Sequence, residues 1–153
     1  MAWVSLMTAD GADRTHEAEL TLRGRMADLA LVSPWIERLA SEYGIPASTQ
    51  FAMNLCLEEV ISNIIRHGYA GRPEGPVTVR CTATGNDSIQ LVVEDSAPHF
   101  NPLEQVETPV ADTLDGTRIG GLGIRLIRKF AATIKYEPTA AGNRLTIGFS
   151  FAS

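Results

Sequence analysis

The chain has 153 residues, of which 44% are hydrophobic and 20% charged, and its formal net charge is −5. This length suits one domain with one core, and the acidic balance argues against general affinity for nucleic-acid phosphates. The sequence contains no run of about 18 apolar residues, so no membrane span is expected, and its first residues lack the pattern of a secretory signal. We therefore expect a cytoplasmic protein. Cys56 and Cys81 are too few for a disulfide framework or a zinc site and are expected to be buried free thiols.

The first part of the chain predicts a tail, a strand and a helix. Residues 1–16 show no sustained period and are expected to form a partly ordered tail. Residues 17–23 alternate between apolar and polar side chains, which is typical of a half-buried strand. Over residues 26–43 apolar side chains recur at helical spacing, and Pro34 either kinks this helix or lies in its first turn.

Residues 51–69, FAMNLCLEEVISNIIRHGY, predict the central helix, for which Ser48 is a candidate N-cap. Glu59 and Asn63 lie one turn apart, with Cβ atoms about 5–6 Å from each other, while Glu58 is off their arc and is expected to face solvent. A carboxylate and a carboxamide so placed could share a water or a metal ion, although such polar residues also typify a solvated helix face. The opposite arc is an apolar stripe of Met53, Leu57, Val60, Ile61 and Ile64.

The second half of the chain predicts two hairpins and a helix. Residues 77–83 and 89–93 alternate as an antiparallel hairpin, and residues 133–137 and 144–151 form another around the turn AAGN. Residues 96–119 are irregular, and helical spacing resumes over 122–130. Helices that are segregated from hairpins predict an α+β two-layer sandwich with a mixed, mainly antiparallel sheet, built from residues 17–153 as a single domain.

A glycine cluster precedes this last helix, at Gly120, Gly121 and Gly123. The start of a helix exposes unpaired N–H groups, and glycines let phosphate oxygens approach them closely, although a short cluster can also be a flexible hinge. No Gly-Lys-Ser/Thr follows, so the cluster is not a P-loop. A dinucleotide fingerprint is also unexpected, because the third glycine and the preceding strand are missing.

The order of these features resembles the GHKL ATPase superfamily: Glu59 and Asn63 at Glu-x-x-x-Asn, then Asp95 ending a strand, a long loop, and the glycine cluster. Within that superfamily, residues 17–151 resemble the small bacterial anti-sigma factor serine/threonine kinases. The resemblance implies the Bergerat (GHKL ATPase) fold, with helices covering one face of the sheet.

The resemblance also implies a site for ATP and Mg²⁺. Asp95 would accept a hydrogen bond from the exocyclic amine of adenine, because a fixed carboxylate suits such a donor. An ordinary strand-end carboxylate is the alternative. Ala97 stands where relatives have Gly. The cofactor-binding residues implied are Asn63, Asp95, Ala97, Phe100, Arg118, Gly120, Gly121 and Gly123, with Pro102 matching beside Phe100.

Roles in catalysis follow from the same resemblance. Asn63 would be the magnesium ligand, and Glu59 would orient or deprotonate the attacking hydroxyl as the catalytic base. Arg118 would contact the γ-phosphate, and residues 96–119 would close as a lid. Arg66 and His67 either contact phosphates or face solvent, and His99 is given no role.

The expected function is that of an anti-sigma factor kinase that uses Mg-ATP. It would phosphorylate a Ser or Thr of an anti-sigma factor antagonist of the STAS type, sequester a sigma factor, and form a homodimer. One alternative is a partner-binding module that holds ATP without phosphotransfer, for which Glu59 would have little use. The other is the catalytic domain of a sensor histidine kinase, although no helical hairpin with a phosphoacceptor His precedes residue 17.

Overall fold

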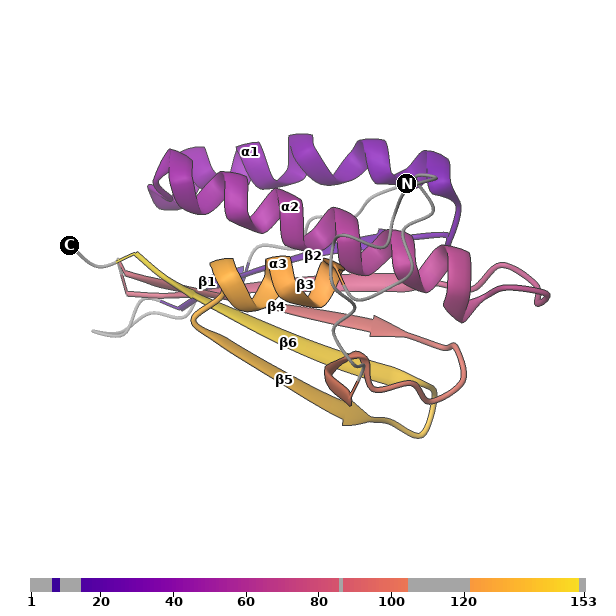
Figure 1. Ribbon diagram of the computed structural model, residues 1–153. Coiled ribbons are helices and arrows are strands. Elements are labelled where there is room, and N and C mark those ends of the chain that lie inside the picture. The colour runs from indigo at the N-terminus through magenta and orange to yellow at the C-terminus, as the bar shows by residue number, and fades with distance from the viewer. Residues whose placement is uncertain (1–6, 9–14, 86, 105–121, 152–153) are drawn as a thin grey trace, which may run out of the picture.

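A computed structural model describes residues 7–8, 15–85, 87–104 and 122–151. A six-stranded sheet carries the helices on one face (Figure 1). The strand order is β1-β2-β3-β4-β6-β5, and every described pair is antiparallel. The predicted α+β two-layer sandwich is confirmed. None of the helices in the described ranges is long and apolar enough to cross a bilayer.

The strands and helices have the following bounds. The strands are β1 (Met7–Thr8), β2 (Thr15–Leu22), β3 (Val77–Thr84), β4 (Ser88–Asp95), β5 (Thr133–Pro138) and β6 (Asn143–Ser150). The α-helices are α1 (Val32–Tyr43), α2 (Ala47–Asn63) and α3 (Leu122–Phe130). Shorter helical turns are η1 (Met26–Leu31), η2 (Ile64–Gly68) and η3 (Pro102–Glu104). The sequence pattern did not indicate the short strand β1, and β2 begins two residues before the predicted strand.

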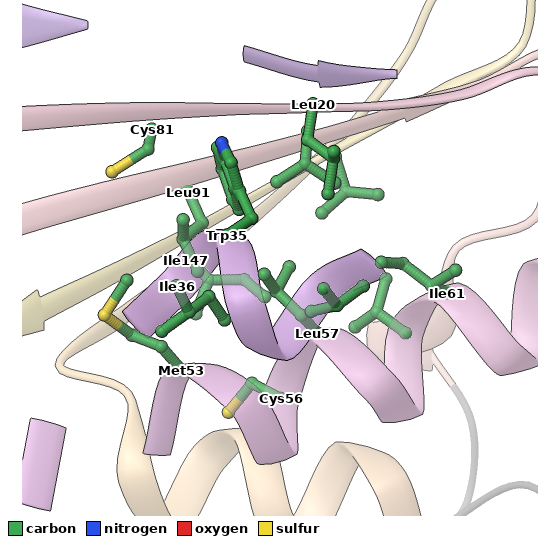
Figure 2. Close-up of a cluster of buried hydrophobic side chains, with 14 of the residues drawn as sticks. Leu20, Trp35, Ile36, Met53, Cys56, Leu57, Ile61, Cys81, Leu91 and Ile147 are labelled. Atoms are coloured by element: carbon green, nitrogen blue, oxygen red, sulfur yellow. The ribbon is translucent and has the colours of Figure 1, made fainter. Parts of the chain in front are cut away.

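The core lies between the sheet and helices α1 and α2 (Figure 2). Alternation along the strands turns one set of side chains inward, where they pack against the apolar stripes of the two helices. Cys56 and Cys81 are buried free thiols, as predicted, and burial raises the pKa of each to about 12. The fully buried members of this core include Leu20, Ile36, Leu39, Met53, Leu57, Ile61, Leu91 and Ile147.

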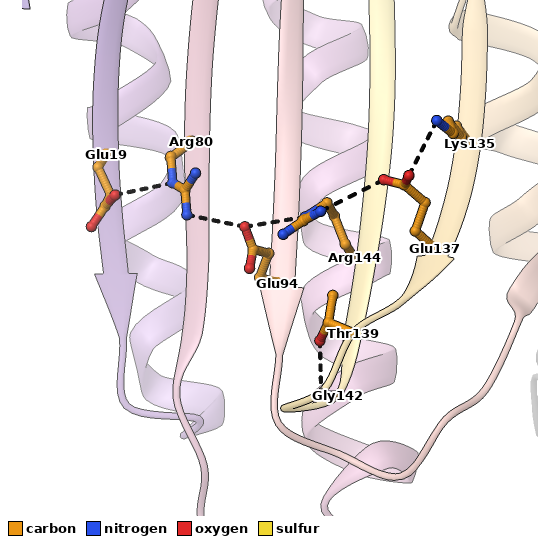
Figure 3. Close-up of polar contacts among 8 residues, drawn as sticks. All are labelled: Glu19, Arg80, Glu94, Lys135, Glu137, Thr139, Gly142 and Arg144. Atoms are coloured by element: carbon orange, nitrogen blue, oxygen red, sulfur yellow. Dashed lines mark hydrogen bonds and ion pairs between the residues drawn. The ribbon is translucent and has the colours of Figure 1, made fainter.

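The other face of the sheet carries a row of alternating charges, which we call the charge ladder (Figure 3). It runs across five strands through Glu19, Arg80, Glu94, Arg144, Glu137 and Lys135. Arg80 contacts Glu19 at 3.3 Å and Glu94 at 3.0 Å. These side chains are substantially exposed, so each pair contributes little to stability.

Two helix starts differ from the sequence pattern. The helix predicted over residues 26–43 is divided into the 3₁₀ turn η1 and α1, and Pro34 lies in the first turn of α1, one of its two predicted positions. The N-cap of α2 is Pro46 rather than Ser48, so that prediction was wrong. Pro46 has extended backbone angles and its carbonyl already accepts the N–H of Gln50 at 2.9 Å, which places Ser48 inside the helix.

The predicted central helix changes its hydrogen bonding at Asn63. The α-helical part ends there, and the π turn η2 follows. In it the N–H of Tyr69 donates to the carbonyl of Ile64 at 3.0 Å, five residues back. Single π turns are frequent at functional sites because they redirect the side chains around them. This one comes directly after the predicted magnesium ligand.

Candidate active site

A cavity of about 540 Å³ lies beside the end of β4, between α2, α3 and the residues that follow β4. This volume is within the usual range for small-molecule sites. Its lining is mostly apolar, with Val93, Ile127 and Leu145 on the sheet and α3 sides. Of the predicted site residues, the cavity brings together Asn63, Asp95, Ala97, Phe100 and Gly123, and Pro102 also lines it.

Asp95, the last residue of β4, is only 9% exposed and lines the cavity. Its Oδ1 accepts hydrogen bonds from Asn143 Nδ2 at 2.8 Å and from the backbone N–H of Ala97 at 2.9 Å. Burial raises the pKa of this carboxyl, and the two donors oppose that shift. Among the described residues none donates to Oδ2, so only one oxygen of this carboxylate is paired within the protein.

Asn143 is a site residue that the sequence analysis missed. It is 8% exposed, and besides Asp95 its amide donates to the carbonyls of Ala97 at 3.3 Å and Pro98 at 3.1 Å. Its Oδ1 accepts from the backbone N–H of Phe100 at 3.0 Å and from the Tyr136 hydroxyl. Asn143 therefore joins the Asp95 carboxylate to the backbone that follows it.

The position of Asn143 depends on strand pairing. The sequence analysis assigned it to the turn AAGN, whereas β6 begins at Asn143, directly opposite Asp95 in the antiparallel pair with β4. A side chain on Gly142 would collide with the backbone carbonyl of Asp95, so the chain approaches closely at that point. The sequence feature that could have indicated Asn143 is a polar residue at the start of the strand expected to pair opposite Asp95.

Ala97 fits the cavity wall because of a glycine opposite it. Its side chain is buried and lines the cavity. A Cβ on Gly68, the last residue of η2, would lie 3.0 Å from the Ala97 methyl group, which is tighter than ordinary contact. The Ala97 methyl group is thus accommodated by the absence of a side chain at residue 68.

Glu59 lies one turn before Asn63 on α2, but the two side chains border different spaces. Asn63 lines the cavity, whereas Glu59 lines an open groove between α2 and η1, together with Met26, Leu29 and other residues. Gly123, in the first turn of α3, lines the cavity. A Cβ built on Gly123 would lie 2.6 Å from Glu59 Oε1 and 2.8 Å from its Cδ. Glu59 therefore packs directly against a residue of the cavity wall.

The two histidines of this region both line the cavity. His67 belongs to η2, and His99 is held by a hydrogen bond from Nε2 to the Thr139 carbonyl at 2.8 Å. Arg66 lines the groove instead and is exposed. Phe100 also lines the cavity and is 55% exposed.

Part of the predicted site lies outside the described residues. This applies to Arg118, Gly120 and Gly121, and to residues 105–119 of the predicted lid. The described part of that lid, residues 96–104, has no regular structure apart from the short turn η3. Glu58 is exposed, as predicted, and borders the groove.

Comparison with known proteins identifies relatives of this chain. The family model described as a histidine kinase-like ATPase domain matches residues 22–149. The serine/threonine-protein kinase BtrW of Bordetella bronchiseptica is 28% identical over 137 residues, which cover 89% of this chain and 94% of that protein. The anti-sigma F factor of Clostridium novyi is 28% identical over 83 residues, which cover 54% of this chain and only 57% of that protein.

Solved structures share the fold. The RsbU and RsbW domains of Rv1364c from Mycobacterium tuberculosis match with a TM-score of 0.61 at 15% identity, over 88% of this chain and 33% of that one. The histidine kinase domain of a blue-light activated kinase from Erythrobacter litoralis matches with a TM-score of 0.51 at 18% identity, over 82% of this chain and 60% of that one. The resemblance to GHKL ATPases and to anti-sigma factor kinases is confirmed. The chain belongs to the histidine kinase-like ATPase domain family, and its relatives include a serine/threonine-protein kinase and anti-sigma factors.

Proposed function

We propose that this protein is an ATP-dependent serine/threonine protein kinase that phosphorylates an anti-sigma factor antagonist and sequesters a sigma factor. The observation that carries the proposal is one cavity with a buried, half-satisfied carboxylate, Asp95, in its wall, together with Asn63 and Gly123, and with Glu59 directly behind Gly123. An adenine site, a phosphate site and a base are the three parts that such a kinase needs.

The adenine site is formed by Asp95 and the apolar lining of the cavity. Oδ2 of Asp95 accepts a hydrogen bond from the exocyclic amine of adenine, while Asn143 and Ala97 hold Oδ1. The apolar lining of Val93, Ile127 and Leu145 suits the flat adenine ring. A purine that carries an oxygen in place of the amine would face Asp95 with two acceptors and would bind less well.

The phosphate part is formed by Asn63 and by the start of α3. The N–H groups in the first turn of α3 suit phosphate oxygens, and Gly123 lets them come close. The donor set fits Mg²⁺: Asn63 supplies one neutral amide oxygen, and phosphates and water supply the others. Within the described ranges no cluster of three or more His, Cys, Asp or Glu could hold a metal by itself. Bound Mg²⁺ would neutralise charge on the phosphates.

Glu59 is the proposed catalytic base. As the acceptor hydroxyl oxygen bonds to the γ-phosphorus, the hydroxyl proton passes to the Glu59 carboxylate, and the bond from that phosphorus to the β–γ bridging oxygen breaks to release ADP. Glu59 borders the open groove and lies against Gly123 of the cavity wall, so a protein substrate in the groove could reach it while the nucleotide fills the cavity.

The partners are proposed from the relatives. A kinase and anti-sigma factors among them support a sigma factor and a STAS-type antagonist as the two protein partners. A homodimer and a role in regulating transcription in the cytoplasm belong to the same proposal. Residues 96–104 would move as part of the lid over the bound nucleotide.

The test is transfer of radiolabelled phosphate from ATP, with Mg²⁺, to the STAS-type proteins of the same genome. Wild type is expected to label one of them on Ser or Thr. Glu59→Gln should bind ATP normally but transfer about 10²- to 10⁴-fold more slowly, which is the usual contribution of a positioned base. Glu58→Gln, one residue away, is the matched control and should transfer like wild type. If wild type binds ATP but labels none of these proteins, a nucleotide-holding partner module is the better assignment.

A further inference from the structure

Gly123 has no backbone reason to be a glycine. It lies in the first turn of α3, and it is not among the glycines with positive φ, which are Gly24, Gly44, Gly71 and Gly85. At an ordinary helical position, Gly is less favourable than Ala by about 1 kcal/mol. Besides the close approach of phosphate proposed above, the packing around residue 123 gives a second reason for the missing side chain.

The space beside Gly123 is filled by Glu59. A Cβ at residue 123 would lie 2.6 Å from Oε1 and 2.8 Å from Cδ of that glutamate, distances at which something must shift. Glu58 precedes Glu59 on α2 and is exposed, and none of the three atoms nearest to that Cβ belongs to it. Gly123 also lines the cavity, so Glu59 lies directly beside the cavity wall.

We propose that Gly123 is a positioning residue for Glu59. Because residue 123 has no side chain, the glutamate side chain occupies the space beside it, and the first turn of α3 thereby determines the position of the carboxylate. This inference rests on the proposed function only where it treats Glu59 as the base. The contact between α2 and α3 is independent of that role. A carboxylate beside the first turn of a helix also interacts favourably with the helix dipole, which helps to keep it there.

The first test measures the folding equilibrium of the nucleotide-free protein by denaturant unfolding. Gly123→Ala is expected to lower the folding equilibrium constant by about 2- to 12-fold, because the Glu59 side chain must leave its present rotamer. In a Glu59→Ala background the same change should instead be stabilising, by up to about fivefold, because only the helix preference of Ala remains. A Glu58→Ala background is the matched control and should behave like wild type.

The outcomes are distinct. If Gly123→Ala lowers stability equally with and without the Glu59 side chain, or does not lower it in wild type, the proposal is overturned. A reversal of sign confined to the Glu59→Ala background supports it. This measurement needs no kinase activity, so failure of the proposed function and failure of this inference remain distinguishable.

The second test uses phosphotransfer to separate positioning from mere packing. Gly123→Ala should lower kcat more than it raises KM for ATP, because the base is displaced while the adenine site remains intact. Glu59→Asp, one methylene shorter, should slow transfer in wild type but recover transfer in the Gly123→Ala background. If Glu59→Asp slows both proteins equally, the position of the carboxylate is not set by Gly123.

Discussion

Asn143 donates from Nδ2 to Asp95 Oδ1 at 2.8 Å across the pair of strands β4 and β6. The two side chains are 8% and 9% exposed, so their hydrogen bond forms largely out of contact with water. A buried polar group that loses its partner is left unsatisfied, and that loss is larger than the net value of the bond. The orientation of the Asp95 carboxylate is therefore set by a residue 48 positions later in the chain.

Replacing Asn143 by Leu should weaken both stability and ATP binding. The change removes two donors and one acceptor and leaves the Phe100 N–H and the Tyr136 hydroxyl without this partner. We expect a loss of about 1–3 kcal/mol in the free energy of unfolding and weaker ATP binding in calorimetric titration. Gln90→Leu, on the exposed face of β4, is the control. Normal ATP affinity in Asn143→Leu would mean that Asp95 is held without it.

Replacing Asp95 by Asn tests adenine recognition directly. The new carboxamide can keep its oxygen toward Asn143 and Ala97, which turns its NH₂ group toward the ligand. The adenine amine would then meet a donor, and a lost charge-assisted hydrogen bond corresponds to roughly 10- to 150-fold in affinity. Titration with ATP gives the result, and unchanged affinity would rule out the adenine assignment.

The same substitution should have the opposite effect on the stability of the nucleotide-free protein. Burial raises the pKa of Asp95 above its ordinary value of 3.8, so the folded state holds its proton to higher pH than the unfolded state does. The stabilisation that comes from the protonated Asp95 carboxyl is fully present below pH 3.8 and is lost as the pH rises through the pKa of Asp95 in the folded state. Asp95→Asn has no such loss. The difference between the unfolding midpoints of Asp95→Asn and wild type should therefore shift in favour of the variant between pH 3 and pH 7. A difference that does not change with pH would contradict this.

Replacing Asn63 by Ala should weaken nucleotide binding only when Mg²⁺ is present. The proposed role is to supply the single protein oxygen of the metal site. Loss of a group that only supports a metal ligand lowers metal affinity by roughly 10- to 100-fold. Loss of the ligand itself should therefore lower the affinity for Mg-ATP by at least as much. With a chelator in place of Mg²⁺, wild type and Asn63→Ala should bind ATP equally. A deficit of the same size under both conditions would point to a structural role for Asn63.

Nucleotide should slow amide exchange in residues 96–104. In this segment the backbone N–H groups of Ala97, Phe100 and Leu103 donate to side chains, those of Asp95, Asn143 and Asn101, so their protection depends on separate side-chain contacts rather than on a regular ladder. A non-hydrolysable ATP analogue with Mg²⁺ is expected to protect the segment, while exchange in β3 stays the same. Equal exchange with and without the analogue would show that these residues do not respond to the nucleotide.

Local patterns were sufficient for most of the fold. Alternation and helical spacing predicted strands β2 to β6 and the three helices, because the pattern of apolar residues reflects which face is buried. The ends of elements were less predictable. Pro46 precedes α2 in an extended conformation and displaces Ser48 from the cap, and this choice depends on the backbone rather than on side-chain preference.

The candidate site was predictable where it depends on one helix, and less so where it depends on pairing. Glu59 and Asn63 lie one turn apart on the same helix, as predicted. Asn143 was missed because its place opposite Asp95 follows from the pairing of β4 with β6, which no local pattern specifies. Gly123 was assigned to phosphates, whereas its contact with Glu59 is visible only after α3 packs on α2.

The charge ladder has a consequence for how the strands find their partners. Successive side chains point to opposite faces, so a shift of one residue along β3, β4 or β6 would bring Arg80, Glu94 or Arg144 under the helices. A charge buried there without a partner would strongly disfavour the shifted pairing, although each correct ion pair adds little to the native state. The ladder thus acts mainly by excluding misaligned sheets during folding.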